Sequence, residues 1–243
     1  MGTRVKQLRT VAALTVILSI LCAAATYAAR NDSSPMKTIF VFGDSLSDGF
    51  HLKRSQAYPA LLLNKLRDAG LQFEVVNASQ SGGTTTSGLS RLPPHLKRNI
   101  DIFILELGIN DAFIGVPVDQ IGANLQSIID QVKARNPQAR VVICGMQIPN
   151  FSADAYVAAF GKVYFELAEK NHAALVPYLL EGVGGDPDLN IADGIHPNSA
   201  GQKILAENVW RVLEPIAREV AVESPRAATG SRPGRSVDLT KSR

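Results

Sequence analysis

The chain has little cysteine, with Cys22 and Cys144 as its two thiols in 243 residues. Cys22 lies in an N-terminal segment that we expect to be removed, so the mature chain keeps one thiol and forms no internal disulfide. The remaining chain of about 190 residues is long enough to be held together by an apolar core instead. The sequence also has no cluster with the spacing of metal ligands, and we expect no cofactor.

Neither sign of charge is in excess. The whole sequence carries 25 Lys and Arg against 22 Asp and Glu. Arg4, Lys6 and Arg9 lie in the N-terminal segment, and beyond residue 220 five basic residues face two acidic ones, which leaves 17 basic against 20 acidic side chains in residues 29–220. This body has no electrostatic reason to bind nucleic acid, and we expect no such partner.

The apolar stretch near the N-terminus, residues 11–25, is short for a transmembrane helix. It follows a basic start and overlaps the mostly small residues 23–29, which is the pattern of a secretory signal peptide. We predict that residues 1–28 are removed on export, to the periplasm or the exterior, and that no membrane span remains; an uncleaved anchor is the alternative. Residues 29–220 then form one domain, and residues 221–243, rich in Ala, Gly, Ser, Pro and Arg, form a flexible basic tail.

Short apolar stretches alternate with longer segments of helical spacing along this domain. The spacing predicts strands at residues 38–42, 73–76, 102–107, 140–146 and 174–177, a polar loop at 77–88, and helices at 55–69, 118–135, 152–171 and 198–220. This alternation predicts an α/β fold, a five-stranded parallel sheet with helices on both faces. Ligands of such sheets bind outside the carboxyl ends of the strands, so function is expected there.

Ser45 follows the first predicted strand directly and is the candidate nucleophile. A serine after Gly-Asp is more often a turn former, so this position alone does not indicate catalysis. The Gly-x-Ser-x-Gly motif of the α/β-hydrolases is absent as well, because Ser47 stands in place of its second glycine. The case for catalysis therefore depends on residues elsewhere in the chain.

Residues after the later strands supply the other groups that acyl transfer requires. A serine nucleophile needs an imidazole base, a carboxylate that orients the imidazole, and donors for the developing oxyanion. His196 would be the base, and Asp193, three residues earlier, the carboxylate. The backbone N–H groups of Ser45 and Gly82 and the side-chain amide of Asn110 would donate to the oxyanion.

These residues stand in four short blocks, Gly-Asp-Ser-Leu at 43–46, Ser-Gly at 81–82, Gly-Ile-Asn-Asp at 108–111 and Asp-Gly-Ile-His-Pro-Asn at 193–198. In order and spacing the blocks resemble those of the SGNH (GDSL) hydrolases, over roughly residues 37–216. The resemblance implies a flavodoxin-like three-layer α/β/α sandwich. It also implies the same roles for the five residues named above.

Two further segments, residues 77–79 and 88–93, resemble a bacterial periplasmic subgroup of this family, which comprises acyl-thioesterases, lysophospholipases and arylesterases. Asp48 and Ile109 depart from that subgroup, which commonly has a small residue and a glycine at these positions. The departures leave the catalytic machinery intact, but they bear on how far its substrates can be carried over.

Large apolar side chains follow Asn110, where polar turn residues would be expected. Phe113, Ile114 and Val116 would line the substrate groove; the alternative is that Phe113 and Ile114 pack beneath the neighbouring helix. The apolar residues near the predicted site are Phe50, Phe113, Ile114, Val116, Ile148 and Phe151. They favour small-molecule acyl esters or thioesters, lysophospholipids included. The alternatives are a carbohydrate O-deacetylase with the same machinery and a non-catalytic binding domain.

Overall fold

The computed structural model describes residues 36–148 and 155–223, so the predicted signal peptide and the predicted tail beyond residue 223 lie outside the described residues. Five strands form one sheet in the order β2-β1-β3-β4-β5, and each neighbouring pair is parallel. The strands are β1 (Lys37–Gly43), β2 (Phe73–Asn77), β3 (Ile102–Glu106), β4 (Arg140–Cys144) and β5 (Ala174–Val176). The prediction of a five-stranded parallel sheet is confirmed.

The central strands β1 and β3 are apolar on both faces because helices cover both sides of the sheet. All residues of β3 are buried, and so are those of β1 from Thr38 onward. Phe40 and Phe103 are partners in the register of these two strands, and their rings stack with centroids 6.2 Å apart. Close packing at the centre of the sheet fixes the positions of the strand ends, where the candidate residues begin.

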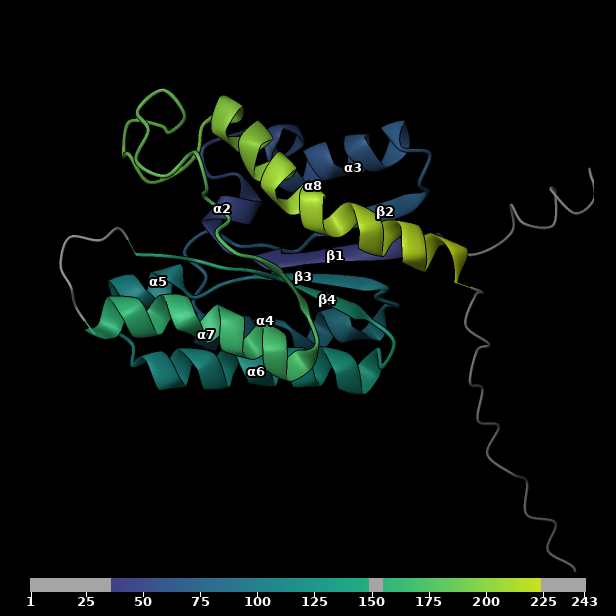
Figure 1. The fold of residues 1–243 in the computed structure, drawn as a ribbon, viewed down its shortest axis with the longest axis horizontal. Helices are drawn as coiled ribbons and strands as arrows, with labels where there is room; N and C mark the ends of the chain where they lie inside the picture. Colours follow the sequence, from purple (N-terminus) through teal and green to yellow (C-terminus); the bar gives the residue numbers. More distant parts are fainter. Residues whose placement is uncertain (1–35, 149–154, 224–243) are drawn as a thin grey trace, which may run out of the picture. The chain divides into compact units, whose positions relative to one another are not determined.

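Helices form a layer on each face of the sheet, as Figure 1 shows. The helices α3 (Tyr58–Asp68) and α8 (Ser199–Val222) pack together on one face. The other face carries α4 (Thr85–Arg91), α6 (Val118–Arg135) and α7 (Ala155–Asn171). The buried side chains of α6 recur every three or four residues, at Ile121, Leu125, Ile128, Ile129 and Val132. The three-layer α/β/α sandwich is therefore confirmed.

The structure corrects several predicted bounds. The helix predicted at 55–69 begins later, at Tyr58, after a short 3₁₀ segment, η1 (Arg54–Gln56). The final helix extends two residues further than predicted, to Val222, and residues 149–154, where another helix was predicted to begin, lie outside the described residues. None of the helices in the described ranges is long and apolar enough to cross a membrane.

Three short helices were not predicted: α2 (Ser45–Asp48), α4 and α5 (Ile109–Phe113); a 3₁₀ segment, η2 (Pro93–Lys97), follows α4. The predicted polar loop at 77–88 is wrong in its second half, because Thr84 and Ser87 each accept a backbone N–H of the other and so begin α4. Residue 88, inside α4, is a glycine because any Cβ there would come within 2.8 Å of a methyl group of Leu107.

Candidate active site

The turn after β1 places Ser45 at the carboxyl edge of the sheet, as the first residue of α2. Asp44 caps this helix, its carboxyl accepting the backbone N–H of Leu46 at 3.0 Å. The backbone N–H of Asp44 donates in turn to the carboxyl of Glu106, also at 3.0 Å. Gly43 leaves room for this contact, since a Cβ there would lie 2.4 Å from Oε2 of Glu106. The turn is thus fixed from both sides, and Ser45 remains 6% exposed.

His196 connects Ser45 to Asp193. Its Nε2 lies 2.9 Å from Oγ of Ser45, and its Nδ1 lies 2.6 Å from Oδ2 of Asp193. The segment between β5 and α8 carries both residues to the end of β1, although His196 is 151 positions from Ser45. Asn198 ends this segment by capping α8, since its side chain accepts the backbone N–H groups of Ala200 and Gly201. The side chains of Ser45, His196 and Asp193 therefore form one continuous hydrogen-bonded chain.

Asp193 is held in its ionised form. Burial alone would raise its pKa, but the backbone N–H groups of His196 and Ile195, together with the His196 ring, outweigh burial and lower the pKa to about 2. The two backbone N–H groups donate to Oδ1 at 3.0 and 2.9 Å. The carboxylate can therefore accept a proton-bearing Nδ1, which leaves Nε2 of His196 free to receive the proton of Ser45.

Three groups near Ser45 are candidates for holding an oxyanion. The backbone N–H groups of Ser45 and Gly82 donate to no acceptor in residues 36–148 or 155–223. Gly82 has a φ of 75°, in the left-handed region that favours glycine. Nδ2 of Asn110 lies 3.1 Å from Oδ2 of Asp44 and 3.0 Å from the carbonyl oxygen of Gly83. The Asn110 amide thus bridges the two segments that carry the backbone donors, and an oxyanion would have to share one of its protons.

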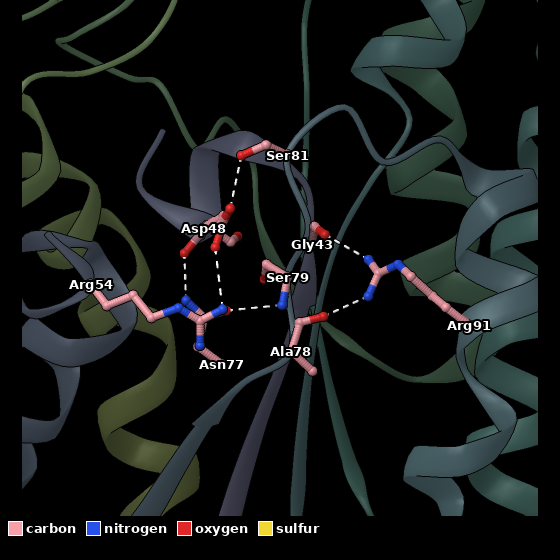
Figure 2. Close-up of polar contacts among 9 residues, drawn as sticks. Gly43, Asp48, Arg54, Asn77, Ala78, Ser79, Ser81 and Arg91 are labelled. Atoms are coloured by element: carbon pink, nitrogen blue, oxygen red, sulfur yellow. Dashed lines mark hydrogen bonds and ion pairs between the residues drawn. The ribbon is translucent and has the colours of Figure 1, made fainter. Parts of the chain in front are cut away.

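Arg91, on α4, joins the two turns that present these backbone donors. Its guanidinium donates to the carbonyl oxygen of Gly43 at 2.7 Å and to that of Ala78 at 2.5 Å (Figure 2). The same group stacks on the Phe42 ring, 3.8 Å from its centroid. One planar, doubly donating cation therefore fixes the spacing between the Ser45 turn and the loop at 78–84.

Asp48 stands where the periplasmic subgroup commonly has a small residue, and it links the loop at 78–84 to α2. Its carboxylate accepts the Ser81 hydroxyl at 2.8 Å and lies 3.5 Å from the guanidinium of Arg54 (Figure 2). Asn77 adds a second link, donating to the carbonyl oxygen of Ser47 at 2.7 Å. Asp48 therefore anchors the residue that precedes Gly82.

The apolar residues after Asn110 differ in their surroundings. Phe113 and Ile114 are 55% and 71% exposed, so the alternative in which they pack beneath the neighbouring helix is wrong. Val116 is half-buried and packs against the core. Ile148 likewise packs against the core, and Phe151 lies outside the described residues. Phe113 and Ile114 are thus the members of the predicted groove set whose side chains are exposed.

The model of the GDSL-like lipase/acylhydrolase family matches residues 41–204, a range that includes every residue of the hydrogen-bonded chain described above. The chain belongs to this family. Esterase TesA of Pseudomonas aeruginosa is 43% identical to it over 181 residues, which are 74% of this chain and 89% of TesA. Thioesterase 1/protease 1/lysophospholipase L1 of Escherichia coli strain K12 is 37% identical over 180 residues, 74% of this chain and 84% of that protein.

Solved structures agree with this assignment. A crystal structure of TesA superposes with a TM-score of 0.70 at 42% sequence identity, covering 74% of this chain and 99% of that one. The protein is therefore a GDSL hydrolase of the SGNH type, a serine hydrolase with esterase relatives. Within the described ranges this hydrolase has no group of three or more His, Cys, Asp or Glu side chains that could hold a metal ion.

Some features around His196 of the GDSL hydrolase could not be predicted from the sequence. The Phe50 ring lies 4.5 Å, centroid to centroid, from the imidazole of His196, and His51 packs on Phe50 at 4.0 Å. Phe50 was expected only as groove lining. Ile195, next to His196, is 49% exposed and was not among the predicted groove residues. Adjacency to His196 in the sequence was the one signal that could have drawn attention to Ile195.

Proposed function

We propose that this GDSL hydrolase is an exported serine esterase that cleaves carboxylic esters or thioesters through an acyl-enzyme on Ser45. The observation that supports it most is the unbroken contact from Oγ of Ser45 through the imidazole of His196 to the carboxylate of Asp193, at 2.9 and 2.6 Å. Nucleophile, base and orienting carboxylate within hydrogen-bonding distance are the arrangement that activates a serine hydroxyl.

In this mechanism, Oγ of Ser45 attacks the ester carbonyl while its proton passes to Nε2 of His196. The ionised Asp193 stabilises the imidazolium that forms. The backbone N–H groups of Ser45 and Gly82 and the amide of Asn110 donate to the oxyanion of the tetrahedral intermediate. Collapse of the intermediate breaks the bond to the alcohol or thiol, which takes the proton from His196. Water then attacks the carbonyl of the acyl-enzyme while one of its protons passes to Nε2 of His196. Collapse of this second intermediate breaks the bond to Oγ of Ser45, which takes the proton from His196, and releases the acid.

Exposed apolar surface beside the site supports an acyl-chain substrate. Phe113 and Ile114 are three and four positions after Asn110, and Ile195 precedes His196; all three side chains are exposed. Burying one methylene against such side chains contributes about 0.8 kcal/mol, or roughly fourfold in the specificity constant. The esterase, thioesterase and lysophospholipase names of the relatives support the same class of substrate. The composition of residues 1–28 supports export.

A fluorophosphonate probe tests the proposal because it forms a covalent bond with an activated serine. We expect the intact mass to increase by one phosphonyl adduct, on Ser45, and Ser45→Ala to abolish both the adduct and ester hydrolysis. A panel of esters of graded chain length, thioesters and acetylated sugars then identifies the substrate class. Preference for acetylated sugars would favour the O-deacetylase alternative, and a folded protein that takes up no probe would favour the binding domain.

A further inference from the structure

Two carboxyl groups lie beneath the Ser45 turn and have no part in the mechanism above. Asp44 precedes Ser45, and Glu106 ends β3, where it is the register partner of Gly43. Both side chains are fully buried, with 0% of their surface exposed. Two adjacent ionised carboxylates without solvent would repel one another and lack hydration, so their protonation state has to be explained.

The contacts of Glu106 favour a protonated carboxyl. Its Oε2 accepts the backbone N–H of Asp44 at 3.0 Å and the hydroxyl of Ser47 at 2.6 Å. The Ser47 hydroxyl also lies 2.8 Å from the phenol oxygen of Tyr58. Oε1 receives no donor from the residues that the structure describes. A buried, ionised oxygen without a donor is costly, whereas a protonated one becomes a donor itself.

The contacts of Asp44 favour an ionised carboxylate. Oδ1 accepts the backbone N–H of Leu46, and Oδ2 accepts an N–H of the Asn110 amide at 3.1 Å. The backbone N–H of Asp44 donates to Oε2 of Glu106, so the two carboxyl groups lie next to one another. Both oxygens of the Asp44 carboxyl thus accept a hydrogen bond, which stabilises the ionised form. The chain of contacts runs from Glu106 through Asp44 to Asn110.

The charges around the pair support one proton rather than none. The other titratable groups that face it are Arg91, Asp111, Tyr58, Cys144 and Tyr164. Arg91 is the one cation among them, and it cannot balance two ionised acids in addition to Asp111. Burial raises the pKa of Asp44 to about 7, and burial together with the Asp44 charge raises the pKa of Glu106 well above its usual range.

We propose that Asp44 and Glu106 share a single proton at neutral pH, carried by Oε1 of Glu106, and that this acid pair positions the Asn110 amide and the Ser45 turn. Glu106 is thus a positioning residue, which acts on the oxyanion donor through Asp44 and touches no reacting atom. The inference rests on the proposed function, because the Asn110 amide has a catalytic role only in that reaction.

The variant Glu106→Gln tests this inference because its side chain has the same shape, can accept the same two donors, places an amide N–H where we propose the proton and cannot ionise. We expect it to keep the turnover number within about threefold at neutral pH, because the swap conserves volume and keeps both hydrogen bonds that Oε2 accepts. Glu106→Ala removes the donor and should lower the turnover number on the order of tenfold or more with little change in KM, since small displacements of catalytic groups are costly.

A melting experiment tests the shared proton without any substrate. As pH rises above the ordinary carboxyl range, the unfolded chain releases the proton while the folded pair retains it, so the native protein loses stability with rising pH. Glu106→Gln lacks the Glu106 carboxyl and therefore lacks the loss of stability that this carboxyl causes. Its melting temperature should therefore match that of the native protein at about pH 5 and exceed it progressively toward about pH 9. The matched control, Glu74→Gln at an exposed position of β2, should melt in parallel with the native protein.

Parallel melting of Glu106→Gln and the native protein from pH 5 to 9 would rule out the shared proton. Equal losses of turnover in folded Glu106→Gln and Glu106→Ala would rule out positioning by a neutral acid. A native protein that hydrolyses no ester would instead refute the proposed function. The melting comparison would still decide the protonation of the pair, so the two failures are distinguishable.

Discussion

Replacement of Asn110 by alanine separates an oxyanion donor from a structural amide. Nδ2 of Asn110 has two protein acceptors, Asp44 and Gly83, so the change removes two hydrogen bonds and leaves Asp44 with one donor fewer. At about 1 kcal/mol for each hydrogen bond, we expect a loss of about 1–3 kcal/mol in the free energy of unfolding. Activity is expected to fall further than this loss of stability explains, because removing an oxyanion donor lowers the turnover number about 100- to 1000-fold.

Asn208, on α8, offers a matched control because it has no role in the proposed reaction. It is buried, and its Nδ2 donates to the carbonyl oxygens of Leu179 and Glu181 at 3.0 and 2.9 Å. Asn208→Ala should cost a similar amount of stability, measured by urea denaturation, and should leave the turnover number of a 4-nitrophenyl ester within about threefold of the native value. If both variants lose activity in proportion to their stability, Asn110 is a structural amide and the reasoning fails.

Three further changes test other parts of the site. Phe50→Ala should lower turnover about two- to fivefold, because a ring face stabilises a nearby cation such as the His196 imidazolium by about 0.5–1 kcal/mol; equal rates in Phe50→Ala and the native enzyme would contradict this. Ile114→Ser should flatten the rise in kcat/KM from acetyl to octanoyl esters while sparing acetyl esters, and equal losses on all chain lengths would show a structural role instead. Asp193→Asn should lower kcat by on the order of 10⁴-fold.

The ionised Asp193 carboxylate also bears on how the rate depends on pH. Asp193 has a pKa lowered to about 2, so it contributes stability above the unfolded carboxyl range and loses it as pH falls toward 2. It therefore stays ionised throughout the range in which an imidazole titrates, about pH 5 to 8. We expect the rate of ester hydrolysis to rise with pH in that range in a single step. A flat profile, with chemistry shown to limit the rate, would contradict an imidazole base.

The fold could be predicted from sequence because its signals are periodic and local. β1 and β3 are uninterrupted apolar runs, and α6 repeats its apolar residues at helical spacing. By contrast, α4 was missed because its start depends on reciprocal hydrogen bonds between Thr84 and Ser87, in a segment with no apolar periodicity. Local side-chain contacts of this kind leave no repeating pattern in the sequence.

The candidate site was predictable where its residues stand in fixed blocks and unpredictable where they meet only in space. The blocks gave Ser45 and His196, which the structure places within hydrogen-bonding distance. Arg91 reaches backbone carbonyl groups 13 and 48 positions away, and no local residue pattern encodes contacts to backbone at such separations. The contact of Glu106 with the Ser45 turn likewise depends on the pairing of β1 with β3.

The central claim is that Ser45 carries the acyl group during turnover, and rapid acid quenching tests it most directly. The enzyme is mixed with a slowly deacylating ester, quenched within the first turnover, digested and analysed by mass spectrometry. We expect the acyl mass on the peptide that contains Ser45, formed at the rate at which the alcohol is released, and no such adduct in His196→Ala. Steady turnover with no acyl adduct on Ser45, or with the adduct on another residue, would contradict the mechanism.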